Sequence, residues 1–191
     1  MRHALTFSLA AATLFALQAQ AAEETRSVAP FSTISNSGPV NLHIEVGKAQ
    51  SVRVSGSDEL VSDLETDVVG NELRLHVRRD TTSFNRNHDS LNVTITVPQL
   101  TAFTMGGAGE TTITHMSGDS LEVRFGGAGS FKADGTVKSL VMHVGGVGSV
   151  KVWASQRLDA SLGGVGSLTY YGDPKTVNTN GGGLGSISKG K

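Results

Sequence analysis

Five glycine-rich turns are the feature of this sequence that first suggests chemistry. Each reads Gly-Gly-x-Gly, and successive turns start 20, 19, 18 and 19 residues apart. The turn glycines are Gly106, Gly107, Gly109, Gly126, Gly127, Gly129, Gly145, Gly146, Gly148, Gly163, Gly164, Gly166, Gly182, Gly183 and Gly185. A phosphate loop needs a following helix N-terminus and a lysine, and a calcium-binding turn needs an aspartate. Alternating apolar segments follow these turns instead. The repetition indicates a structural corner, with no metal or cofactor predicted.

A serine follows four of the five turns, at Ser130, Ser149, Ser167 and Ser186. A nucleophilic serine requires a neighbouring base and a group that orients the base. Four equivalent nucleophiles do not make one active site, and no repeat pairs its serine with His and Asp. We therefore expect a ladder of hydroxyls that bond the backbone of neighbouring turns.

Charged and polar residues before the turns form the first candidate binding face. Alignment of the repeats places Arg124, His143 and Asp159 at outward positions of successive strands. Glu122 and Asp159 could form the carboxylate pair of a carbohydrate-active enzyme, such as a polysaccharide lyase or hydrolase. They could equally be solvated surface charges, which is the ordinary state of such residues.

Two aromatic residues form the second candidate. Trp153 and Tyr171 both follow the first glycine of their own turn by eight residues, so they could stack on adjacent repeats. Paired aromatics suit contact with sugar rings or proteins. The alternative is that they cover a loop between repeats.

Alternation of apolar and polar residues identifies the elements that position these candidates. Apolar residues lie one, three and five positions before most turns, and a second apolar alternation follows each turn. This period of two is typical of strands. A repeat of about 19 residues buries its apolar face only if successive repeats stack. The sequence therefore predicts an all-β, parallel β-solenoid (β-helix-like) of about five rungs over 100–191, after a strand-rich section over 31–99.

The residue between the glycines of each turn is expected to point inward and to form a column at the corner. These residues are Ala108, Ala128, Val147, Val165 and Leu184. The two sections together are expected to form one continuous domain over 31–187.

The N-terminus has the features of a secretory signal. An apolar segment over 4–17 precedes Ala19-Gln20-Ala21, whose small residues suit cleavage after Ala21. We expect a signal peptide over 1–21 and a flexible stretch over 22–30. The chain has no cysteine, so a lipoprotein anchor is not expected. The predicted location is periplasmic or extracellular, without a transmembrane segment in the mature chain.

Composition excludes one class of partner. The net charge is −1 and no basic stripe is apparent along the sequence, so nucleic acid is not an expected partner. His-x-His and His-x₃-His spacings are missing as well, so the histidines predict no metal site.

The sequence resembles one known family. The stretches that carry the resemblance are Val40–Gly56, Asp58–Val77, the strand end Val97-Pro98-Gln99-Leu100 and the five turns. They are similar to the bacterial exported domains of unknown function named putative auto-transporter adhesin, head GIN domain. The resemblance covers about 30–187 and implies no catalytic residues. An exported β-solenoid with a polar surface is expected to be an adhesin-like, non-enzymatic module that binds an unknown protein or glycan at the cell envelope. The alternatives are a carbohydrate-active enzyme and a periplasmic scaffold or sensor partner.

Overall fold

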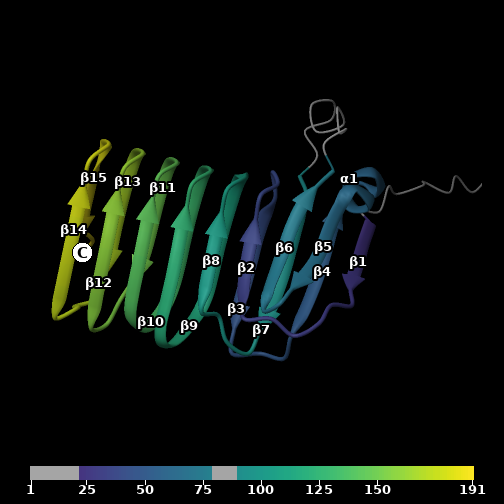
Figure 1. Ribbon diagram of the computed structural model, residues 1–191, viewed down its shortest axis with the longest axis horizontal. Helices are drawn as coiled ribbons and strands as arrows, with labels where there is room; N and C mark the ends of the chain where they lie inside the picture. The colour runs from purple at the N-terminus through teal and green to yellow at the C-terminus, as the bar shows by residue number, and fades with distance from the viewer. Residues whose placement is uncertain (1–21, 79–89) are drawn as a thin grey trace, which may run out of the picture.

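A computed structural model describes residues 22–78 and 90–191 as a flattened coil of strands with one helix (Figure 1). The elements are β1 (Ala22–Arg26), β2 (Thr33–Asn36), β3 (Asn41–Val46), β4 (Ser51–Gly56), α1 (Asp58–Asp63), β5 (Leu64–Val69), β6 (Glu72–Val77), β7 (Asn92–Val97), β8 (Ala102–Met105), β9 (Ala108–Phe125), β10 (Ala128–Val144), β11 (Val147–Trp153), β12 (Arg157–Leu162), β13 (Val165–Tyr171), β14 (Thr176–Gly181) and β15 (Leu184–Lys189). The predicted signal peptide lies outside the described residues.

The strands form two stacks that continue into one another at the corners of the coil. Strands that lead into the glycine turns form what we call the entry sheet, in the order β5-β6-β2-β8-β9-β10-β12-β14. Strands that leave the turns form the exit sheet, in the order β1-β4-β7-β3-β9-β10-β11-β13-β15. The long strands β9 and β10 run through both sheets. From β8 to β15 every pair is parallel, with one register shift between Ala133 and Gly135 in the β9–β10 pair, so the predicted parallel β-solenoid is confirmed.

The core lies between the two sheets and is made by the inward half of each alternation. In β12, for example, Leu158, Ala160 and Leu162 are buried. Phe103 of the entry sheet stacks on Phe131 of the exit sheet, with ring centroids 5.5 Å apart. The contact shows that the sheets pack face to face, so their other faces point outward.

The stacked coil begins earlier than the five glycine turns suggest. β2 and β3 pair in parallel with β8 and β9, and the turn between them contains Gly38. A Cβ built on Gly107 would lie under 3.0 Å from the carbonyl oxygen of Gly38, so the two turns stack directly. In the sequence, the alternation of Ile34 with Ser35 before this turn indicated the additional rung. It was missed because this turn has one glycine and does not match the Gly-Gly-x-Gly repeat.

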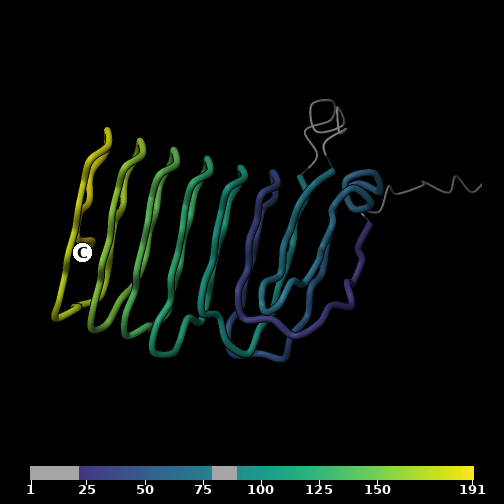
Figure 2. Tube along the Cα trace, viewed as in Figure 1, coloured from purple at the N-terminus to yellow at the C-terminus, as the bar shows by residue number. Residues whose placement is uncertain are grey.

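Antiparallel strands close the N-terminal end of the coil. β6 and β7 continue the parallel stacks, whereas β4 pairs antiparallel with β7 and β5 pairs antiparallel with β6. Helix α1 connects β4 to β5. The structure corrects the expectation of a flexible stretch over 22–30, because residues 22–26 form β1 and pair antiparallel with β4. At the other end the rungs follow one another in an even row (Figure 2).

The second and fourth glycines of the turns are sterically required. At Gly146 and Gly164 a Cβ would lie under 3.0 Å from a backbone carbonyl oxygen of the preceding rung. Gly148 has a φ of 152° and meets the same obstacle. The first glycine differs, since at Gly145 and Gly163 nothing lies within 4 Å of an added Cβ. The predicted structural role therefore applies to the second and fourth positions of each turn, and the first glycine is not sterically required.

The residue between the glycines points outward, and the prediction of an inward column is wrong. Val147 is 57% exposed, Val165 is 46% exposed and Leu184 is 82% exposed. Ala108 and Ala128 are exposed too. The reason is that the second and fourth glycines place their backbone against the previous rung, which leaves the residue between them at the outer apex. These five residues form an exposed apolar ridge, which we call the corner ridge.

Among the described elements, α1 covers only Asp58–Asp63, and no described helix is long and apolar enough to cross a membrane.

Candidate functional site

The outer face of the entry sheet aligns polar side chains from successive rungs. Arg124, His143, Ser161 and Asn180 occupy one column, because each is the register partner of the next. His143 Nδ1 lies 2.9 Å from Ser161 Oγ. The predicted outward alignment of Arg124 with His143 on successive strands is therefore confirmed.

The neighbouring column contains Asp159, which is held by two polar partners. Arg157 donates to both carboxylate oxygens, at 2.5 and 3.1 Å, and Asn178 Nδ2 donates to Oδ1 at 2.7 Å. The hydrogen bonds from Arg157 and then from Asn178 lower the pKa of Asp159 below its ordinary value. Asp159 is thus a fixed anion and hydrogen-bond acceptor.

Glu122 lies in the same column as Asp159, with Val141 between them. It forms its own ion pair with Arg124, at 2.5 Å. Two strand spacings separate the two carboxylates, or roughly 10 Å. Each acid is therefore neutralised on its own strand, which opposes proton donation by Asp159.

A shallow depression of about 240 Å³ lies over β10, β12 and β14 on this face. Its lining includes His143, Asp159, Ser161, Asn178 and Asn180. The depression offers an imidazole, a hydroxyl, two amides and a carboxylate within one small area. Such a set binds a polar ligand through hydrogen bonds to side chains that are already oriented.

The aromatic pair lies on the other sheet. Trp153 and Tyr171 are register partners on β11 and β13, and their rings stack with centroids 4.3 Å apart. The predicted stacking on adjacent rungs is confirmed. Gly190 lies so close to the Tyr171 ring that an added Cβ would come within 3.0 Å of it, and Lys132 Nζ lies 5.8 Å from the Trp153 centroid. Both rings are partly buried, so neighbours restrict access to their faces.

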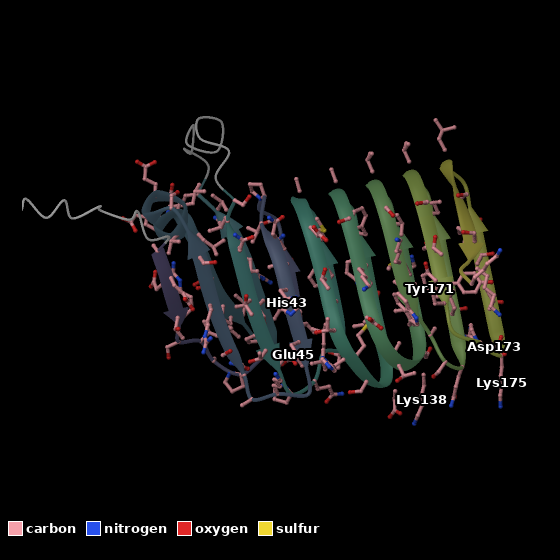
Figure 3. All side chains as sticks on the ribbon, turned by 180° about the vertical axis from the view of Figure 1, so that it is seen from behind. His43, Glu45, Lys138, Tyr171, Asp173 and Lys175 are labelled. Carbon is pink, nitrogen blue, oxygen red and sulfur yellow. The ribbon has the colours of Figure 1, made fainter. Side chains whose placement is uncertain are left out.

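The structure therefore divides the five predicted binding residues into two groups. Arg124, His143 and Asp159 share the outer face of the entry sheet, while Trp153 and Tyr171 belong to the exit sheet (Figure 3 labels Tyr171). Sequence reasoning missed Arg157, the ion-pair partner of Asp159. Its position two residues before Asp159 was the available signal, since alternate residues of a strand share a face.

The serine ladder differs from its prediction. Ser130, Ser149, Ser167 and Ser186 align in register, but within the described part of the chain their hydroxyls make no side-chain hydrogen bond. The cause is that they point outward from the exit sheet. Among residues 22–78 and 90–191, no group of three or more His, Asp or Glu side chains is arranged to hold a metal.

Fold and surface together define a class: an elongated parallel β-solenoid with outward polar columns at a constant spacing. The chain belongs to the family described as "Putative auto-transporter adhesin, head GIN domain", whose model matches residues 30–146. The family relation implied by the turns and strand ends is thereby confirmed.

Solved structures share this fold at low sequence identity. A putative adhesin from Bacteroides fragilis is 21% identical, with a TM-score of 0.62 over 90% of this chain and 98% of its own. A putative adhesin from Parabacteroides distasonis is 14% identical, with a TM-score of 0.51 over 90% of this chain and 97% of its own. No curated protein sequence matches the chain significantly.

Proposed function

We propose that this protein is a non-enzymatic, adhesin-like module that binds a glycan at the cell envelope through the outer face of its entry sheet. The observation that carries the proposal is the depression over β10, β12 and β14, where His143, Asp159 and Asn178 converge. Amide, imidazole and carboxylate groups bind the hydroxyls of a saccharide by donating and accepting hydrogen bonds. Membership of an adhesin-like family supports the same function.

The location belongs to the same proposal. An adhesin-like module must leave the cytoplasm, and the predicted signal over 1–21 would provide export with cleavage after Ala21. On this proposal the mature protein acts in the periplasm or at the cell surface.

The carbohydrate-active enzyme is the less favoured candidate because Asp159 is unsuited to acid catalysis. A general acid needs a raised pKa, whereas that of Asp159 is lowered by Arg157 and Asn178. A periplasmic scaffold or sensor partner would use the same outer faces to bind a protein.

The test is binding of the purified protein to an array of immobilised polysaccharides and to intact bacterial cells. His143→Ala and Asn178→Ala should each weaken binding by about fivefold to tenfold, as expected for the loss of one or two hydrogen bonds. His76→Ala is the matched control, since His76 lies on β6 of the same sheet, far from the depression, and should leave binding unchanged.

Three outcomes would reject the proposal. The first is no binding to any glycan or cell, and the second is equal loss in the His76 variant. The third is release of new reducing ends from a bound glycan that stops in Asp159→Asn, which would establish the enzyme instead.

A further inference from the structure

The outer face of the exit sheet contains a column of eight residues without an acid. The register aligns Arg53, Thr94, His43, Thr112, Lys132, Lys151, Thr169 and Ser188 on eight consecutive strands. All eight are exposed or partly exposed. We call this set the cationic column. The alignment of Lys132 with Lys151 follows from the repeat, but their alignment with Arg53 was not visible along the sequence, because β4 lies far from β10 and β11 in the chain.

The cations of this column are poorly neutralised. Within the described residues, Arg53 and Lys151 form no ion pair and no side-chain hydrogen bond. Lys132 has only a distant partner, Asp134 at 3.9 Å. The entry sheet is the opposite case, since Arg124 and Arg157 each contact an acid on their own strand.

A second depression, of about 210 Å³, lies on this column around His43. Its lining includes Asn41, Thr94 and Thr112, which place amide and hydroxyl groups beside His43 between the cations Arg53 and Lys132 of the column. Figure 3 shows His43 on this broad face, with Tyr171 several strands away on the same face. The column is therefore both a line of positive charge and a line of hydrogen-bond donors.

Three acids flank the column and limit its charge: Asp134 beside Lys132, and Glu45 and Glu110 beside His43 and Thr112. Glu45 is occupied by Lys48 at 2.9 Å and by His115 at 3.5 Å. Glu110 lines the depression beside His43, and its side chain has no ion-pair partner in the described part of the chain. Of these three acids, Glu110 is therefore the one that would repel an anion at the column most strongly.

We propose that the cationic column binds a linear acidic polysaccharide, such as a polyuronate, that runs across the strands. The spacing of the cations supports the choice of a linear polymer. Five strand steps of about 4.8 Å separate Arg53 from Lys151, so the cations are distributed over about 24 Å. A polyuronate has one carboxylate on each sugar ring among several hydroxyls, which suits cations separated by threonines and serines. This site lies on the other sheet from the depression of the proposed function, and it does not depend on that function.

Nucleic acid fits the same column less well. Duplex DNA presents a charge about every 1.7 Å, a far higher density than four basic side chains over about 24 Å. Single strands are bound by stacking of bases on open aromatic faces, but the rings of Trp153 and Tyr171 stack on each other. The chain also has a net charge of −1.

The experiment measures binding of the purified protein to alginate, a linear polyuronate, with neutral dextran and a single-stranded DNA as comparison ligands. Binding to alginate should weaken as salt is added, because salt screens exposed charges. Lys132→Gln with Lys151→Gln should weaken it by about tenfold or more. Lys138→Gln with Lys175→Gln is the matched control with the same change in net charge. These two lysines lie at the lower rim of the coil in Figure 3, and their loss should change binding by less than about twofold.

Two further variants test the geometry. Arg53→Gln should weaken binding of long oligouronates that span the column, and should leave short ones that reach only Lys132 and Lys151 unaffected. Glu110→Gln should tighten binding, because it removes the flanking negative charge.

The proposal fails if alginate does not bind, if both lysine pairs have equal effects, or if the DNA binds as tightly as alginate. Circular dichroism on each variant shows that the coil remains folded. Loss of alginate binding in the column variants with unchanged binding in His143→Ala would separate this site from the one on the entry sheet.

Discussion

A side chain at Gly146 would collide with the backbone carbonyl oxygen of Gly127 on the preceding rung, at a separation below 3.0 Å. Neighbouring Gly145 has open space around an added Cβ. Both glycines donate a backbone hydrogen bond to Phe125 of the preceding rung, yet only Gly146 lacks room for a side chain.

Gly146→Ala should therefore destabilise the protein by about 3 kcal/mol or more, since backbone atoms on both rungs would have to move. Gly145→Ala should change the free energy of unfolding by no more than about 0.5 kcal/mol, the usual range for an open surface position. Denaturant unfolding of the two variants measures the difference. Equal effects would show that the turns do not stack as described.

A pair of leucines tests the outward direction of the corner ridge. Leu168 is completely buried in the core and Leu184 is 82% exposed at the ridge. Leu168→Ala should cost about 2–5 kcal/mol through lost burial and a residual cavity. Leu184→Ala should cost less than about 0.5 kcal/mol, as measured by denaturant unfolding. A large decrease in the free energy of unfolding for Leu184→Ala would instead support the inward position that the sequence predicted.

Arg157 controls the ionisation of Asp159. The pKa of Asp159 is lowered first by its hydrogen bonds to Arg157 and then to Asn178, so Arg157→Gln should raise the pKa of Asp159 toward its ordinary value. An NMR titration of the Asp159 carboxyl carbon measures the change.

The sign of the pH effect on stability follows from that shift. A carboxyl with a depressed pKa in the folded state stabilises the fold above its unfolded-state pKa, and that stabilisation is lost as the pH falls through its folded-state pKa. The acid-induced loss should be smaller in Arg157→Gln than in the wild-type protein. Lys138→Gln, which removes the partner of Asp119, should leave the titration of Asp159 unchanged.

Trp153 is the single tryptophan of the chain. Its fluorescence therefore measures whether its ring stacks on Tyr171. Tyr171→Ala should expose the indole and shift its fluorescence emission to longer wavelength. Gly190→Ala should produce a smaller shift in the same direction, because its Cβ would push against the Tyr171 ring. Tyr170→Phe is the control, since Tyr170 faces the other side of β13, and it should leave the emission unchanged. An unshifted emission in Tyr171→Ala would contradict the stacking.

Much of the fold was available from the sequence because local repetition encodes it. The glycine turns predict the corners, and the alternation through Leu158, Ala160 and Leu162 predicts which side chains are buried, since strand side chains alternate between faces. The N-terminal closure was less predictable. Antiparallel pairing of β1, β4 and β5 depends on contacts between distant segments, and no repeat in the sequence predicts it.

The candidate sites also combine features that the sequence predicts with features that only the tertiary structure shows. The column of Arg124, His143 and Ser161 follows from a repeat of nearly constant length, so the sequence alone determined that these side chains are stacked. Only the tertiary structure decided that Trp153 belongs to the other sheet, that Val147 points to solvent, and that Arg53 and Lys151 share one column. The physical reason is that repeats determine neighbours along the coil, whereas the direction of a corner residue and the pairing of non-repeating strands depend on close packing between backbones that are remote in sequence.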